Sequence, residues 1–281
     1  MRRALLVLAG CASFSCAAAE PPRAPDATVA ARLDGQPALT EGDISDWQAA
    51  QACYGAGALT SRRAALMRLV EAAVAEKAMA RAGKAFSEAG LSAEAERIDR
   101  ETQAPAILAC IKKTLQPRER YLRVFVRPTL VESRLRSFLI ADPGVQAGPR
   151  ERSEKVLARV RKGAGMGAAA RGAGFAYSSA TYSLAGSSPF EEDFIRRFLQ
   201  GLKPGELRQE PIESDYDFRL VRLLGSESGR WTFESASVPK VSQEQWFQSA
   251  PKMRLEIADK EMRAWMKGIK GNPRLAAVEI R

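Results

Sequence analysis

Apolar residues in the first half of the chain recur with the spacing of amphipathic helices. The clearest helical stretch is residues 62–83, where one apolar stripe follows the i, i+3, i+4, i+7 rule: Leu66, Leu69, Val70, Ala73 and Val74. Thr40 and Asp43 have the spacing of a capping box, which predicts that an earlier helix begins at Thr40. Further helices are predicted over residues 92–115, with a break near Pro105, and over 117–126, 129–140 and 150–162.

Strand-like patterns are confined to two parts of the chain. A short one, residues 27–33, precedes the turn Asp34–Gly35 near the N-terminus. The others follow residues 142–149 (DPGVQAGP), which have the composition of a linker. Strands are predicted there over residues 175–184, 218–224 and 231–238, with a helix over 190–202. One long helix over 243–270 and a strand over 276–280 complete an α+β fold that is mainly helical.

The N-terminus has the three parts of a secretory signal. Arg2 and Arg3 are positively charged, residues 4–10 are apolar, and Ala17-Ala18-Ala19 is a small-residue cleavage site. We therefore expect residues 1–19 to be removed and the mature protein to start at Glu20 in the periplasm. Residues 8–11 also have the form of a lipobox, and cleavage there would leave an acylated Cys11 as a membrane tether. Both alternatives give an exported protein.

The composition excludes several classes of site. The chain has no histidine, which rules out a Ser-His-Asp triad, a histidine general base and a histidine zinc site. We therefore expect no metal and no other cofactor. The net charge is +10, but no basic run is interleaved with aromatic residues, so we expect no nucleic-acid partner. Cys53 and Cys110 are the only cysteines after the signal, and they predict either a disulfide or two buried free thiols.

Three stretches of the sequence resemble one known family. The first comprises residues 29–44 (VAARLDGQPALTEGDI) and the helix over 62–83, the second is residues 154–224, and the third is residues 265–281 (WMKGIKGNPRLAAVEIR). In this order they are similar to the SurA and PpiC group, periplasmic chaperones that carry a parvulin-type peptidyl-prolyl isomerase domain. The resemblance covers nearly the whole mature chain and is carried by the order and spacing of the stretches.

The resemblance implies how the chain is divided. Residues 20–141 would form an N-terminal helical chaperone module, and residues 142–240 a degenerate parvulin-like domain inserted into it. Residues 241–281 would return to the N-terminal module, so that strands from both ends of the chain meet. In the family the helices that carry Cys53 and Cys110 pack together, which would make these cysteines neighbours.

The resemblance also indicates candidate sites. Parvulin domains usually have a histidine on the first strand and another on the last, whereas here both are missing and Asp217 stands at the second position. The candidates for a proline pocket are Met166, Phe175, Tyr177, Phe190, Phe194 and Phe218. The candidates for client binding are Trp47, Leu66, Leu69, Val70 and Trp265. The competing interpretation is that these apolar residues form the hydrophobic core.

The function that the resemblance implies is binding rather than catalysis. We expect an exported chaperone of the cell envelope whose partners are unfolded or outer-membrane proteins, with weak or absent isomerase activity. One alternative is an active parvulin-type isomerase, since twisting a prolyl bond requires a complementary pocket more than acid–base chemistry. Another is a factor dedicated to one secretion or assembly system, with or without a lipid anchor.

Overall fold

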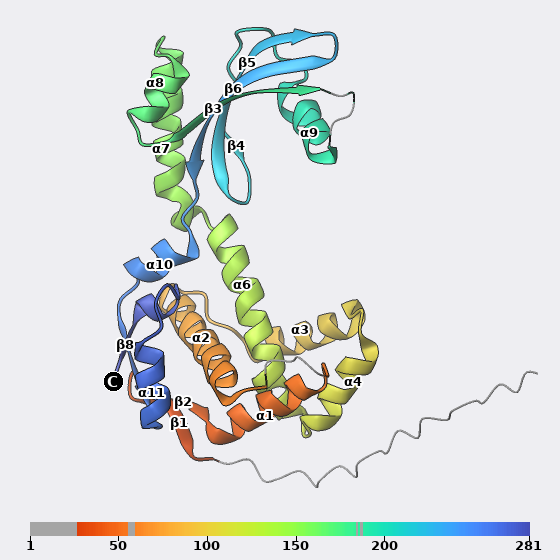
Figure 1. The fold of residues 1–281 in the computed structure, drawn as a ribbon, viewed down its shortest axis with the longest axis vertical. Helices are drawn as coiled ribbons and strands as arrows, with labels where there is room; N and C mark the ends of the chain where they lie inside the picture. Colours follow the sequence, from red (N-terminus) through yellow and green to blue (C-terminus); the bar gives the residue numbers. More distant parts are fainter. Residues whose placement is uncertain (1–26, 56–59, 184, 186–187) are drawn as a thin grey trace, which may run out of the picture.

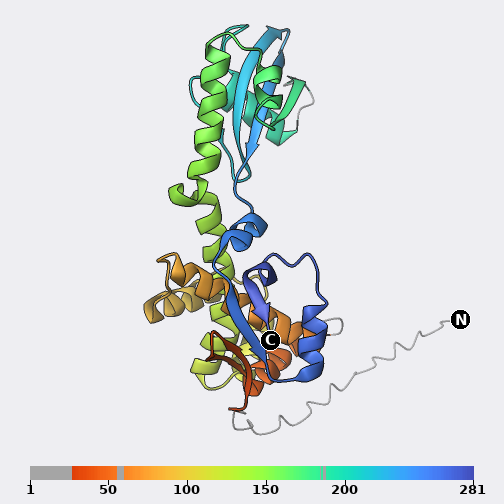
Figure 2. The ribbon, with the colours of Figure 1, turned by 90° about the vertical axis from the view of Figure 1, so that its left-hand side faces the viewer.

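The computed structural model describes residues 27–55, 60–183, 185 and 188–281. The predicted signal peptide, residues 1–19, and the alternative lipid site Cys11 lie outside the described residues. The described chain forms two lobes that lie end to end, one mainly helical and one built around a sheet (Figure 1; Figure 2). The prediction of a mainly helical α+β fold is confirmed at this level.

The helical lobe contains residues from both ends of the chain. From the N-terminal part it takes β1 (Val29–Leu33), β2 (Gln36–Thr40), α1 (Glu41–Ala52), α2 (Arg62–Arg81), α3 (Glu88–Glu101), α4 (Pro105–Thr114), α5 (Arg118–Tyr121), η1 (Leu122–Val126) and α6 (Arg127–Ala141). From the C-terminal part it takes α10 (Gln243–Ser249), β7 (Met253–Ile257), α11 (Lys260–Lys267), η3 (Leu275–Ala277) and β8 (Val278–Ile280).

One four-stranded sheet joins the two chain ends in the order β2-β1-β7-β8. β1 pairs antiparallel with β7, with Ala31 opposite Ile257, and β7 pairs in parallel with β8. The Asp34 N–H donates to the Arg254 carbonyl at 2.8 Å, and the Arg254 N–H donates to the Asp34 carboxylate at 2.8 Å. The sheet and α2 share one apolar core, so residues more than 200 positions apart in the sequence depend on each other for burial.

The sheet lobe comprises residues 143–239. Its helices are α7 (Pro143–Arg161), α8 (Met166–Arg171) and α9 (Pro189–Phe194), which continues as the π-helical turn η2 (Ile195–Leu199). Its strands are β3 (Ala176–Ser183), β4 (Ile212–Glu213), β5 (Asp217–Glu227) and β6 (Arg230–Pro239), antiparallel in the order β3-β6-β5-β4. α7 and α8 pack against one face of this sheet, and α9 with η2 packs against the other.

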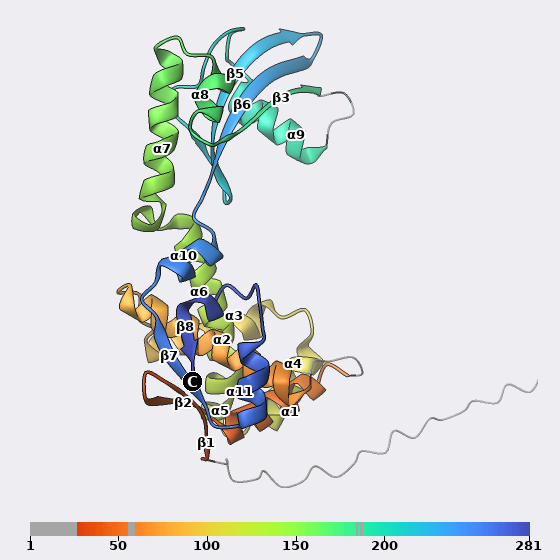
Figure 3. The same ribbon diagram turned by 60° about the vertical axis from the view of Figure 1, so that its left-hand side comes forward.

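Two connections join the lobes. α6 ends and α7 begins at Asp142, whose carboxylate accepts hydrogen bonds from the N–H groups of Gly144 at 3.0 Å and Val145 at 3.2 Å. On the return path, β6 leads through Lys240 and Val241 into α10 (Figure 3).

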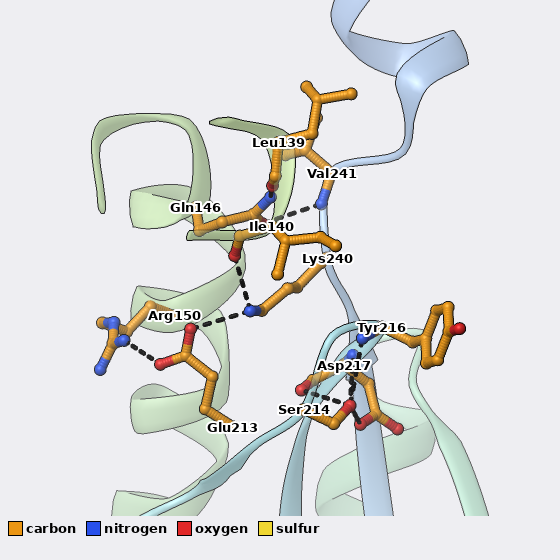
Figure 4. A network of polar contacts seen from close by, with 10 residues as sticks. All are labelled: Leu139, Ile140, Gln146, Arg150, Glu213, Ser214, Tyr216, Asp217, Lys240 and Val241. Carbon is orange, nitrogen blue, oxygen red and sulfur yellow. Dashed lines mark hydrogen bonds and ion pairs between the residues drawn. The ribbon is translucent and has the colours of Figure 1, made fainter. Parts of the chain in front are cut away.

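Buried polar side chains hold these two connections together (Figure 4). Lys240 Nζ donates to the Ile140 carbonyl and to the Glu213 carboxylate, each at 2.8 Å. The Gln146 side-chain oxygen accepts from the Val241 N–H at 2.9 Å. Because Lys240 and Gln146 are both buried, breaking these bonds would leave polar groups without partners, so the bonds stabilise the contact between the two connections.

Three predictions about the elements are wrong. The expected linker, residues 142–149, is the start of α7, because Asp142 is a good N-cap and Pro143 suits the first helical position. The helices predicted separately over 117–126 and 129–140 are continuous: α5, η1 and α6 follow one another without a break, and the Thr129 hydroxyl donates to the Phe125 carbonyl at 2.9 Å. The single long helix predicted over 243–270 is instead divided into α10, β7 and α11. In addition, strand β2 was not predicted.

Candidate functional site

The proline-pocket candidates lie on different sides of the sheet lobe. Met166, Phe175 and Phe218 are buried between the sheet and the helices α7 and α8. Phe194, the last residue of α9, is buried against the opposite face of the sheet. Phe190 is 64% exposed, and Tyr177 is 39% exposed with its hydroxyl bonded to Glu234 at 2.9 Å. The structure therefore does not bring these side chains together as one pocket, and the buried ones belong to two separate cores.

Asp217 is the first residue of β5 and is almost fully buried, with 9% of its surface exposed. Both of its carboxylate oxygens accept hydrogen bonds: Oδ1 from the Ser214 hydroxyl at 2.6 Å (Figure 4), and Oδ2 from the Arg219 guanidinium at 2.9 Å. Burial acts to raise the pKa of Asp217, but the bonds from Ser214 and Arg219 outweigh it and hold that pKa below its ordinary value. A carboxylate stabilised in this way is a weak base.

The client-binding candidates are mostly core residues. Trp47, Leu66, Leu69 and Val70 are all buried in the apolar core that α1 and α2 share with the sheet of the helical lobe. Trp265 is partly buried and packs against the same core, with the Arg63 guanidinium 5.6 Å from its ring centroid. Four of the five candidate side chains are therefore buried in the core, and Trp265 is partly exposed.

A hollow that the sequence reasoning missed lies beside α2, where α3 and the α5–η1–α6 helix approach it. It has a volume of about 390 Å³, and Leu69 is the one client-binding candidate among its lining residues. Its wall includes the apolar side chains of Leu39, Ala72 and Leu91, and its charged lining residues include Arg123 and Arg127. Apolar walls with charged groups beside them can hold an apolar side chain while bonding to the polar backbone next to it.

Arg123 and Arg127 line one side of this hollow, and Arg120 precedes them on the same continuous helix. Arg120 binds Asp46 with Nε 2.7 Å from the carboxylate, and Arg123 binds Asp43, also at 2.7 Å. The spacing of Arg120, Arg123 and Arg127 is the sequence signal that identifies this face, since side chains three, four or seven positions apart lie on one side of a helix. The π-helical turn η1 (Leu122–Val126) contains Arg123 and lies between Arg120 and Arg127.

Arg127 binds the carboxylate of Glu76 on α2 at 3.0 Å and that of Glu88 on α3 at 3.3 Å. Burial raises the pKa of Glu76 above its ordinary value, and Arg127 offsets this only in part. Glu76 is thus a charged group placed unfavourably for stability at the wall of the hollow. Costly charges of this kind are more common at binding sites than in structural cores.

A second hollow, of about 570 Å³, lies on the other part of α6, between the end of α2 and the start of α3. Met79, Phe86, Leu130 and Phe138 give it apolar walls, and Lys84, Arg134 and Asp142 give it charged ones. The Lys84 ammonium binds the Asp142 carboxylate at 2.9 Å. The helical lobe thus has two adjacent hollows of similar chemistry beside α6.

Cys53 and Cys110 are joined by a disulfide, with their Cα atoms 5.9 Å apart. The bond connects the end of α1 to α4, and the apolar side chains around it, including Leu108 and Ile111, form a separate core. Disulfides persist mainly in oxidising compartments.

Comparisons of the chain with models of protein families, with curated proteins and with solved structures found no match. In the described ranges, no helix combines the length and apolar character that crossing a membrane requires. Within the same residues, no three cysteine, aspartate or glutamate side chains come together as a metal-binding group.

Proposed function

We propose that this chain is an exported chaperone of the cell envelope, related to parvulin-type peptidyl-prolyl isomerases, that binds unfolded or outer-membrane proteins. The binding activity belongs to surfaces that accept extended segments of other chains. The chain does not catalyse prolyl isomerisation to a useful extent.

The observation that supports this proposal most is the way the ends of the chain meet. β1 and β7 are neighbours in one sheet, so residues 143–239 are an insertion into a lobe made from both termini. This is the arrangement expected of the SurA and PpiC group. The two hollows beside α6 and the disulfide, which suits an oxidising compartment, agree with an exported binding protein.

Three features argue against the isomerase alternative. The chain has no histidine, and both oxygens of Asp217 are occupied by Ser214 and Arg219. The apolar residues that could hold a proline ring are divided between the two faces of the sheet. An isomerase needs one pocket that favours the twisted imide, and these side chains do not form it.

A paired assay on residues 20–281 tests the proposal. The purified protein is added to an unfolded outer-membrane protein, whose aggregation is followed by light scattering, and to a short prolyl peptide, whose cis–trans exchange is followed in parallel. We expect suppressed aggregation and unchanged exchange, both in the wild type and in Asp217→Asn. Rapid exchange without suppression of aggregation would identify an enzyme instead.

A further inference from the structure

Strand β3 has a free edge. It is the end strand of the sheet in the sheet lobe, and in the described part of the chain only β6 pairs with it (Figure 1). Residues 176–179 and Thr181 are exposed, so most of the strand is accessible to solvent. A free edge presents backbone N–H and C=O groups that have no partner in the sheet.

The hydrogen-bonding pattern identifies which residues of β3 carry these groups. The Val221 carbonyl accepts from the Arg208 N–H at 3.0 Å, so the odd-numbered residues of β5 bond away from β6. Along a strand of an antiparallel sheet, successive residues bond alternately to the neighbour on one side and the neighbour on the other. The even-numbered residues of β5 therefore bond to β6, and since Leu220 pairs with Ala236, the odd-numbered residues of β6 bond to β3. Because Ser235 pairs with Ser178, the even-numbered residues of β3 bond to β6. The residues with outward N–H and C=O groups are therefore Tyr177, Ser179, Thr181 and Ser183.

This edge lacks the features that usually prevent strand pairing. Edge strands of natural proteins are protected by charged side chains, prolines, bulges or short length. β3 (AYSSATYS) is eight residues long and contains no charged residue and no proline. Its register with β6 runs from Ala176 to Ser183 without a shift, so there is no bulge. The outer edge is thus a regular, uncharged template for one more strand.

We propose that the outer edge of β3 binds an extended, neutral or acidic segment of an unfolded polypeptide by adding it to the sheet as a further strand. This inference rests on the proposed chaperone function and names one surface that performs it. Main-chain hydrogen bonds would supply the affinity, which suits clients of varied sequence.

The charges on the chain favour such a client over a second copy of the protein. The net charge is +10, which opposes pairing of two identical chains and favours a neutral or acidic partner. Arg171 is the last residue of α8, and Tyr177 is near one end of the β3 edge. Atoms of both side chains lie within 3.4 Å of the position that a Cβ on Gly167 would occupy, so Arg171 lies beside Tyr177. A cation there adds attraction for an acidic residue of the bound segment.

The test compares two substitutions at one outward position. Ser179→Pro removes the outward N–H without removing a backbone bond to β6, but it also loses the hydroxyl that donates to the Phe233 carbonyl at 3.2 Å. Ser179→Ala loses the same hydroxyl bond and keeps the N–H, so the two variants differ in the outward N–H. The probe is a fluorescein-labelled ten-residue peptide of alternating threonine and valine with two glutamates, and its binding to residues 20–281 is measured by fluorescence anisotropy. We expect Ser179→Pro to weaken binding about tenfold and Ser179→Ala less than about twofold.

A second pair of variants guards against misfolding of the proline variant. The Thr181 and Thr232 hydroxyls lie 2.9 Å apart on neighbouring strands, but only Thr181 is on the edge strand. Thr181→Lys should weaken binding of an uncharged version of the peptide, and Thr232→Lys should not. Methylating alternate backbone nitrogens of the peptide should abolish binding, because it removes the donors that a strand needs.

The outcomes separate this inference from the proposed function. Unchanged binding in Ser179→Pro and Thr181→Lys, with aggregation still suppressed by the wild type, would overturn the β3 edge and leave the chaperone function in place. A wild-type dimer that only the edge variants dissociate would assign the edge to a second copy and would also overturn it. If the wild type neither binds the peptide nor suppresses aggregation, the chaperone function fails too.

Discussion

At the residue scale, Asp217 is a buried carboxylate and Glu76 a partly buried one, and their surroundings shift their pKa values in opposite directions. Asp217 receives a hydroxyl and a guanidinium donor, which outweigh the effect of burial on its pKa. For Glu76, burial outweighs the attraction of Arg127, which also binds Glu88. The first carboxylate therefore stabilises the fold when it is ionised, and the second lowers stability when it is ionised.

Asp217→Asn should lower the free energy of unfolding at neutral pH by about 1–2 kcal/mol, since a buried bond to a charged group is lost. The pKa of Asp217 is lower in the folded protein than its ordinary value of 3.8. Its contribution to stability is therefore present above pH 3.8 and is lost as the pH falls through the lower, folded value. Urea unfolding at several pH values should show a smaller acid-induced loss of stability in Asp217→Asn than in the wild type. An equal loss in both proteins would contradict this account.

Glu76→Gln is the matched comparison, because Glu76 should make stability depend on pH in the opposite direction to Asp217. The pKa of Glu76 is raised from its ordinary value of 4.5, so the folded protein binds a proton more readily than the unfolded chain. Wild-type stability should therefore fall as the pH rises through the range just above 4.5, and this component should be absent in Glu76→Gln. Urea unfolding in that range measures it. Identical pH profiles for the wild type and Glu76→Gln would show that Glu76 titrates normally.

Some of these residue-level features could be predicted from the sequence. The Thr40–Asp43 capping box is present, with Asp43 accepting from the Thr40 N–H at 2.8 Å, because such a box depends only on local spacing. The apolar candidates for the two sites could not be assigned in the same way. Whether Phe194 and Phe218 face one pocket depends on which face of the sheet each occupies, and that is set by strand register and helix packing rather than by local pattern.

At the element scale, the Cys53–Cys110 disulfide is the main covalent constraint on the helical lobe. It spans 57 residues of sequence, and in the chain-entropy model a loop of that size contributes about 4 kcal/mol. The double substitution Cys53→Ser with Cys110→Ser should lower the free energy of unfolding by this amount relative to the oxidised wild type. Urea unfolding measures the difference as a lower midpoint. Adding dithiothreitol should destabilise the wild type similarly and leave the double variant unchanged. If the reductant affects neither protein, the bond does not contribute to stability.

Two of the strands that were missed, β7 and β2, share a physical cause. β7 (Met253–Ile257) follows Pro251 and has an alternating burial pattern, but its five residues are too few to stand out within a region that also suits a helix. β2 contains Pro37 and lies at the edge of its sheet, where proline is tolerated. Both strands are stabilised by pairing with β1, a contact that the local pattern does not reveal.

At the scale of the whole molecule, the helical lobe depends on both ends of the chain. Ending the chain after Lys240 removes β7, β8 and α11, and exposes the apolar surface of β1 and α2. We expect amide hydrogens of α2 to exchange in the truncated protein as in an unfolded chain, while those of β5 and β6 stay protected by the separate cores of the sheet lobe. Hydrogen-exchange mass spectrometry measures both regions at once. Continued protection of α2 would contradict the dependence of the lobe on the C-terminal segment.

The sequence predicted that strands from the two ends of the chain would meet, but not how. The N-terminal strand β1 and the closing strand β8 are in one sheet, yet they do not pair directly, because β7 lies between them. The two-lobed shape depends on α6 and α7 meeting at Asp142 and on the buried contacts of Lys240 and Gln146. The Lys240 and Gln146 contacts join residues about 100 positions apart, which a local pattern does not reveal.

The central claim is that the protein recognises the unfolded state of its clients. Its most direct test is to measure the affinity of residues 20–281 for one outer-membrane protein in two states: unfolded by dilution from urea, and folded in detergent micelles. The account predicts saturable binding to the unfolded form and at least about a hundredfold weaker binding to the folded form, because only an unfolded chain offers free backbone and apolar segments. Equal affinity for both forms, or no binding to the unfolded one, would contradict it.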